Sequence, residues 1–130
     1  MKQLIYTLLL FISVLGSTTG RTLSLGEISI TSSLNQALQA SITVKNIQGL
    51  QTEEIIVSIA NKKRFKSAGV EYLHFYRQFK FEIREINENE VSIEIRSHGS
   101  VIEPSLNFII EVQTPTGRSF KQYTLLVEPL

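Results

Sequence analysis

The sequence predicts an all-β fold, an immunoglobulin-like sandwich of two antiparallel sheets with about seven strands and one short helix. Apolar and polar residues alternate in seven separate runs, which is the period of a half-buried strand. Polar segments rich in Asn, Gly, Pro and Ser separate most of these runs, and 130 residues suit a single domain. Two packed sheets are the usual solution for such a pattern, with a small barrel as the alternative.

The first residues have the features of a secretory signal peptide. Lys2 gives a positive start, residues 4–15 form an apolar run, and residues 16–20 are the small or polar residues typical of a cleavage site. The run is shorter than the roughly 20 residues that a membrane-spanning helix needs. We therefore expect a signal peptide at 1–20 and a secreted domain at 21–130, with no membrane span after cleavage. An uncleaved anchor is the alternative.

Charge argues against two classes of partner. The 13 Lys and Arg residues include Lys2, so the chain without its signal has 12 of them, against 12 acidic residues. Nucleic acids and anionic membranes usually select a clustered basic excess, which a neutral domain lacks. We therefore expect no nucleic-acid partner.

The strands follow from the alternating runs in chain order, with turn signals between most of them. The runs cover residues 28–30, 38–44, 55–59, 79–83, 91–95, 106–112 and 120–127, and the turn signals cover 46–49, 87–89, 97–100 and 114–117.

The last turn signal predicts a hairpin over residues 105–128. Pro115 stands early in a tight turn, and Gly117 stands where a positive φ would be needed. Pairing of opposite charges would place Glu111 opposite Lys121 in this hairpin.

One segment departs from the strand period and predicts a short helix or helical turn. Asn61 suits the N-cap, Phe65 and Ala68 share one helical face, and Gly69 suits the C-terminal stop. The basic residues 62–64 would crowd the positive end of the helix dipole, which is unfavourable.

Charge also predicts the register between the runs 79–83 and 91–95. With Ile83 opposite Val91, Lys80 faces Glu94. A shift by two residues would oppose Glu82 to Glu94, and like charges destabilise a strand pair by up to about 1 kcal/mol. We therefore predict the first register.

Few residues could carry catalysis or bind a metal. The chain has no cysteine and no aspartate, and its two histidines, His74 and His98, lie in "EYLHFYRQF" and "SHGS" with nothing to bring them together. A packing or surface role for His74 and an exposed loop for His98 are the simpler interpretations. No glycine-rich phosphate loop occurs. The sequence therefore predicts no enzyme, no metal and no cofactor.

Aromatic and basic residues interleave in "YLHFYRQFKF", residues 72–81. Stacking of bases or sugars on these rings is one hypothesis, and a core formed by the last two phenylalanines, covered by the other rings, is the alternative. We take Tyr72, His74 and Tyr76 as candidate surface residues for binding a partner.

Three ordered segments resemble the N-terminal periplasmic domain of FimV-type proteins, bacterial envelope proteins linked to type IV pilus assembly and polar organisation. The segments are "LGEISITSSLNQALQASI", "SIANKKRFKSAGVE" and "EPSLNFIIEVQTPTGRSFKQYTLLVEP", and the resemblance covers about residues 23–129. Ala37 and Thr114 depart from the family pattern, both at turns. The family-motif positions to which we assign structural roles are Gly26, Asn35, Gln36, Gly69, Pro104, Asn107, Gly117 and Tyr123.

The resemblance implies a non-enzymatic protein-interaction module of the Gram-negative envelope. Its partners would be envelope proteins, among them a pilus secretin or assembly components, contacted through a sheet edge or exposed loops. The insert at 32–36 is predicted as a structural turn, with a partner-binding edge as the alternative. The alternative function is a peptidoglycan- or glycan-binding domain that acts without a LysM module, and a relic without retained function is the third possibility. The oligomeric state is not predicted.

Overall fold

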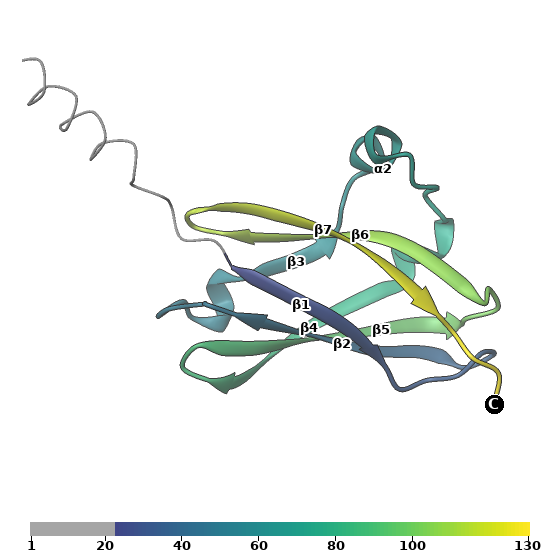
Figure 1. Cartoon of the computed structure of the whole chain (residues 1–130), viewed down its shortest axis with the longest axis horizontal. Helices are drawn as coiled ribbons and strands as arrows, with labels where there is room; N and C mark the ends of the chain where they lie inside the picture. The colour runs from purple at the N-terminus through teal and green to yellow at the C-terminus, as the bar shows by residue number, and fades with distance from the viewer. Residues whose placement is uncertain (1–22) are drawn as a thin grey trace, which may run out of the picture.

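The computed structural model describes residues 23–130, which form a sandwich of two antiparallel sheets (Figure 1). One sheet has the strand order β1-β2-β5-β4 and the other has the order β3-β6-β7, which is the arrangement of a constant-type immunoglobulin domain. The predicted all-β immunoglobulin-like sandwich with one short α-helix is confirmed, and the predicted signal peptide lies outside the described residues. The strands are β1 (Ser24–Ile30), β2 (Ala37–Lys45), β3 (Ile56–Ile59), β4 (Phe79–Asn87), β5 (Glu90–Ser100), β6 (Ser105–Thr114) and β7 (Gly117–Leu126).

The core lies between the two sheets and uses the apolar positions of each alternating run. Because successive side chains of a strand point to opposite faces, every second residue of the central strands β2, β5 and β6 faces inward. These strands and β7 supply most of the buried residues: Leu38, Ala40, Ile42, Val44, Val91, Ile93, Ile95, Leu106, Phe108, Ile110, Val112, Tyr123 and Leu125.

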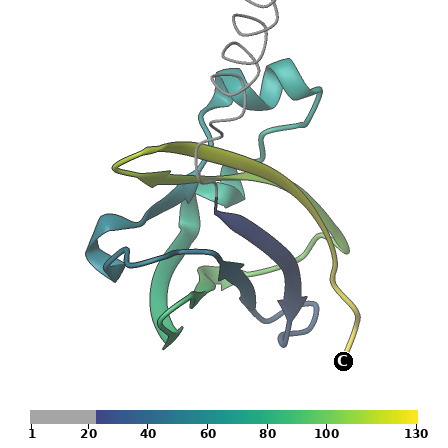
Figure 2. The ribbon, with the colours of Figure 1, turned by 60° about the vertical axis from the view of Figure 1, so that its left-hand side comes forward.

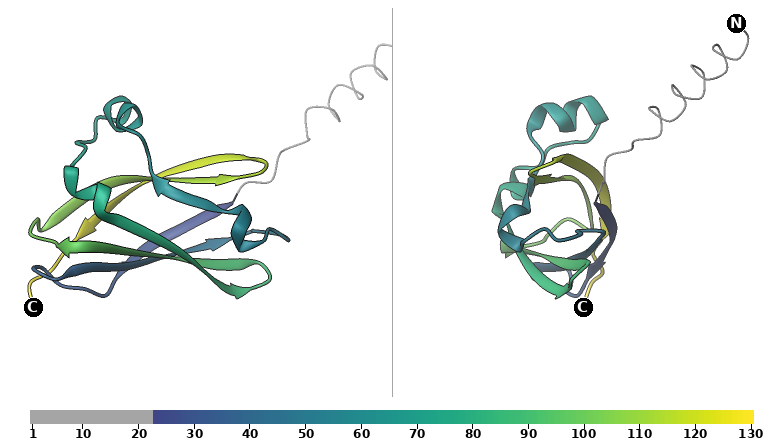
Figure 3. Two further views of the ribbon diagram at one scale, coloured as in Figure 1. Left: turned by 180° about the vertical axis from the view of Figure 1, so that it is seen from behind. Right: turned by 90° about the vertical axis from the view of Figure 1, so that its left-hand side faces the viewer.

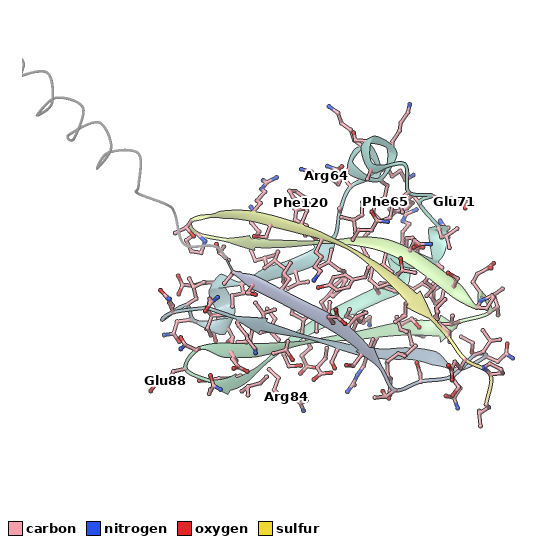
Figure 4. All side chains as sticks on the ribbon, in the orientation of Figure 1. Arg64, Phe65, Glu71, Arg84, Glu88 and Phe120 are labelled. Atoms are coloured by element: carbon pink, nitrogen blue, oxygen red, sulfur yellow. The ribbon has the colours of Figure 1, made fainter. Side chains whose placement is uncertain are left out.

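Helix α2 (Lys62–Ala68) follows β3 and lies outside the β3-β6-β7 sheet (Figure 2). The Asn61 side chain accepts a hydrogen bond from the Arg64 N–H, and Gly69 ends the helix with φ of 71°, as predicted. Phe65 is buried, whereas Ala68 is exposed. The Arg64 guanidinium lies over the Phe120 ring, with 3.5 Å from Cζ to the ring centroid (Figure 4). This cation–π contact offsets the unfavourable place of a basic residue near the helix N-terminus.

Asn61→Ala should lower the free energy of unfolding by about 1 kcal/mol, because the Arg64 N–H then loses its side-chain acceptor at 2.8 Å. Urea unfolding followed by circular dichroism measures this loss. The matched control is Ser67→Ala, at an exposed position of the same helix. That control should change stability by no more than about 0.5 kcal/mol. Equal effects of the two substitutions would contradict the cap.

The predicted register between β4 and β5 is wrong by two residues. Ile83 faces Ile93, and Glu82 faces Glu94. The favourable charge pair is diagonal, since Arg84 Nη2 lies 2.6 Å from Glu94 Oε1. A shift by two residues keeps the same side chains on the core face, so alternation does not choose between the two registers.

The final hairpin forms as predicted, but its charge pair differs. Glu111 faces Phe120, and its Oε1 lies 3.5 Å from Nη1 of Arg118. Lys121 instead reaches across to β1 and donates a hydrogen bond to the Leu25 carbonyl at 3.0 Å. The long lysine side chain is therefore used between the sheets rather than within the hairpin.

The turn predicted at 97–100 is wrong, because β5 continues through this segment and the chain leaves the sheet only after it. His98 is consequently an exposed strand residue rather than a loop residue. The Ser97 hydroxyl donates to the Gly99 carbonyl at 2.7 Å and accepts from the Leu38 N–H at 2.8 Å. This side-chain bridge holds the strand where its register with β2 shifts.

Candidate interaction surface

The structure buries Tyr76, so the prediction that it is a surface residue is wrong. The 3₁₀ helix η2 (His74–Gln78) turns this side chain into the core, where it is 2% exposed. Its ring packs 5.6 Å from Phe79 and 5.8 Å from Phe108 between centroids. The sequence signal for this burial is the spacing of three between Leu73, Tyr76 and Phe79, which is typical of a 3₁₀ turn.

The Tyr76 hydroxyl completes the hydrogen bonding of β6. It donates to the Asn107 carbonyl at 2.5 Å and accepts from the Asn107 N–H at 3.2 Å. β3 pairs with β6 only from Ile110 to Gln113, so the phenol occupies the place of a strand partner beyond the end of β3. Burial raises the pKa of Tyr76, and the bond to Asn107 opposes that rise.

Tyr72, His74 and Tyr76 do not form one surface patch, because Tyr76 is buried and meets the Tyr72 ring inside the domain, at 6.1 Å between centroids. Tyr72 is half-buried, with its ring edge-on to Phe65 at 5.0 Å between centroids, and Lys62 Nζ lies 5.5 Å from the Tyr72 centroid. His74 is exposed on η2. Partner binding by Tyr72 and His74 stays a prediction.

The insert between β1 and β2, residues 32–36, forms a turn that is hydrogen-bonded to the segment after β5. Asn35 has φ of 68° and donates its N–H to the Val101 carbonyl at 2.7 Å. The Val101 N–H in turn donates to the Gln36 carbonyl at 2.8 Å, and the Gln36 side chain accepts from the Ser33 N–H at 2.9 Å. The start of β2 is thereby tied to the end of β5.

Side chains of β7 close one long side of the sandwich. The Gly26 carbonyl accepts hydrogen bonds from Tyr123 Oη at 2.8 Å and from Lys121 Nζ at 3.4 Å. The pairing of β1 with β2 shifts between Leu25 and Ile28, which turns this carbonyl toward the other sheet. The Leu25 and Gly26 carbonyls at the edge of β1 therefore accept hydrogen bonds from within the domain.

Burial raises the pKa of Tyr123 to about 12, from the ordinary value of 10.0. Because the folded pKa is the higher one, the stability contributed by neutral Tyr123 is present below pH 10.0 and is lost as the pH rises to about 12. The difference in unfolding free energy between wild type and Tyr123→Phe should therefore shrink across this window, as measured by urea unfolding. A phenolate absorbance change for Tyr123 that is complete near pH 10.0 would contradict this.

On the opposite long side, β3 and β4 are the edge strands of different sheets and do not pair with each other, and we call this the open side (Figure 3). A hollow of about 440 Å³ lies there, and a second hollow of about 430 Å³ adjoins it under the β4–β5 hairpin. The two hollows share Thr52 and Glu53 of the 3₁₀ helix η1 (Thr52–Glu54). We call the first hollow the β3–β4 groove; its walls include Glu53, Ile55, Ile56, Val57, Phe81, Glu82 and Ile83.

Two negative findings concern residues 23–130. Within this range no group of three or more His, Cys, Asp or Glu side chains could hold a metal ion. No helix among the same residues is long and apolar enough to cross a membrane. His74 and His98 lie apart in the chain, on η2 and β5, and both are exposed.

A family model described as the FimV N-terminal Ig-like domain matches residues 23–130, which is the whole described range. The chain belongs to this family. The resemblance predicted from three sequence segments is therefore confirmed, and the sandwich is that of a FimV N-terminal domain.

The curated relatives are two proteins named "Motility hub protein FimV", from two strains of Pseudomonas aeruginosa. Each is 38% identical to this chain over 117 residues. The match covers 90% of this chain but 13% of each relative, so the chain spans a small part of the length of those FimV proteins. No solved structure matches the chain significantly.

Four of the family-motif residues lie where strands or sheets contact each other. Gly26 and Tyr123 join the two sheets, and Asn107 receives Tyr76. The Pro104 carbonyl accepts a hydrogen bond from the Val127 N–H at 2.8 Å, just after the end of β7. No sequence pattern predicts the β3–β4 groove, because its walls come from separate strands of different sheets.

Proposed function

We propose that this FimV N-terminal domain is a non-enzymatic protein-interaction module of the Gram-negative envelope, working in the periplasm in type IV pilus or secretin-related assembly. The observation that supports this function best is the open side between β3 and β4. Ile56 is 58% exposed there, although most large apolar side chains of the described residues are covered. An apolar residue between two free sheet edges is suited to contact with another protein.

The relatives' name agrees with this proposal, because a hub protein works by contacting other proteins. Glycan binding has less support. Aromatic rings that stack on sugars must present a free face, whereas Tyr76 is buried and Tyr72 packs against Phe65. The family membership also agrees with the absence of an enzymatic role.

Affinity capture tests the proposed function. The full chain, carrying a C-terminal tag, is expressed in a Gram-negative host with a type IV pilus, and the envelope is crosslinked before purification and mass spectrometry. A folded, unrelated immunoglobulin-like domain sent to the same compartment is the control. Specific enrichment of pilus or secretin components over the control is the expected result.

The alternative is tested on the same preparation by sedimentation with purified peptidoglycan. Co-sedimentation of the chain, together with no enrichment of any envelope protein above the control, would replace the proposed function with glycan binding.

A further inference from the structure

We propose that the β3–β4 groove receives an extended segment of a partner protein, with alternating apolar and basic side chains, which adds as a strand to the free edge of β4. This inference rests on the proposed function, because it names how and to what chemistry the interaction module binds. Three features of the groove lead to it: a free strand edge, an apolar floor and an acidic rim.

The free edge follows from the strand order. β4 ends one sheet and β3 ends the other, and both lie on the same long side of the sandwich, since residues of both strands line the groove. β4 is 9 residues long, against 4 residues for β3, so β4 offers the longer row of backbone donors and acceptors. On the opposite side, Tyr123 and Lys121 already bond to the β1 backbone. Strand addition therefore favours the open side and, within it, β4.

The apolar floor determines what the inward side chains of the added segment must be. Phe81 and Ile83 of β4 are half-buried and pack against the core, and Val57 of β3 does the same across the groove. Ile56 stays exposed at the same place. In a strand added to β4, every second side chain would point to the face that carries Phe81, over this floor. Those side chains must be apolar to cover it.

The acidic rim determines the charge of the remaining side chains. The groove and the adjoining hollow together are lined by Glu53, Glu82, Glu85 and Glu88, and by no lysine or arginine. The two ion pairs found among residues 23–130 involve other glutamates, Glu94 and Glu111. No rim glutamate takes part in either pair. On the exposed face of β4, Glu82 lies between Lys80 and Arg84, and Arg84 is paired with Glu94. The rim glutamates are complementary to Lys or Arg on a partner.

The direct test uses a fluorescent peptide of alternating Val and Lys and the full chain, at low and at high salt. One control peptide alternates Val and Glu, and another has the Val and Lys residues in two separate blocks. We expect fluorescence anisotropy to show binding of the alternating Val–Lys peptide alone, weakening with salt. Hydrogen exchange measured by NMR should show new protection of β4 amides.

Variants locate the site. Glu53→Gln combined with Glu82→Gln should weaken peptide binding by about tenfold, since two favourable charges of the rim are lost. Glu27→Gln combined with Glu128→Gln removes the same number of charges at exposed positions that do not line the groove. That control pair should leave the affinity unchanged.

Several results would overturn the inference: no binding of the alternating peptide, equal binding of the block peptide, or protection outside β4. A dimer in analytical ultracentrifugation that the Glu53/Glu82 variant abolishes would assign the groove to a second copy instead. The envelope capture separates this inference from the proposed function. If the Glu53/Glu82 variant enriches the same pilus components as wild type, the interaction function stands and the groove does not carry it.

Discussion

Tyr76→Ala is expected to lower the free energy of unfolding by about 4 kcal/mol, the largest effect of any substitution considered for this domain. The ring is 2% exposed and lies among Phe65, Phe79 and Phe108, so its removal leaves a cavity in the core. The hydroxyl also serves both backbone groups of Asn107. Urea unfolding followed by circular dichroism measures the change.

Tyr76→Phe separates the hydroxyl from the ring. It keeps the packing and should cost about 1–3 kcal/mol, because the Asn107 N–H and carbonyl lose their partner. Tyr72→Phe is the matched control, since Tyr72 is half-buried and takes part in the same ring cluster. If Tyr76→Phe were as stable as the wild type, the phenol would not be the partner of β6.

Tyr76 also shows where sequence reasoning fails. Aromatic and basic residues interleave in residues 72–81, and this pattern favours Tyr76 as a surface residue. In the structure a 3₁₀ turn precedes β4, and its period of three brings Tyr76 onto the core side. A short segment can fit both the period of two of a strand and the period of three of a 3₁₀ turn. Packing of Tyr76 against Phe65 and Phe108 favours the second.

The strands themselves were predictable because their information is local. Alternation in β2, β5 and β6 marks both the strands and their buried faces, and the caps of α2 are carried by Asn61 and Gly69. The register between β4 and β5, by contrast, cannot be predicted from alternation. A shift by two preserves alternation, so only side-chain reach, here from Arg84 to Glu94, distinguishes the two registers.

The candidate interaction surface depends on information that is not local. The β3–β4 groove arises because the two sheets end on the same side, at strands separated in sequence by α2 and η2. In the sequence its glutamates look like ordinary solvent-exposed residues. Only their gathering around an apolar floor distinguishes them, and that follows from the topology.

The closed side of the sandwich can be tested through Gly26, whose place in the family motif has a steric explanation. A Cβ at this position would lie 2.7 Å from the Thr43 carbonyl oxygen, which is backbone and cannot rotate away. Gly26→Ala must therefore push β1 from β2 and disturb the bond from Tyr123 Oη to the Gly26 carbonyl. We expect a loss of about 2 kcal/mol in the free energy of unfolding, measured by urea unfolding.

Gly99→Ala is the matched control, because its Cβ would lie 2.8 Å from Oε1 of Gln78, the far end of a flexible side chain. That side chain can move, so the loss should stay below about 1 kcal/mol. Equal losses would contradict the steric account of Gly26. β1 and β4 lie at opposite edges of one sheet, so Gly26→Ala should also leave the affinity for the Val–Lys peptide unchanged under conditions where the variant is folded. A stability defect without a binding defect would separate the side that holds the sandwich closed from the side that we propose binds the partner.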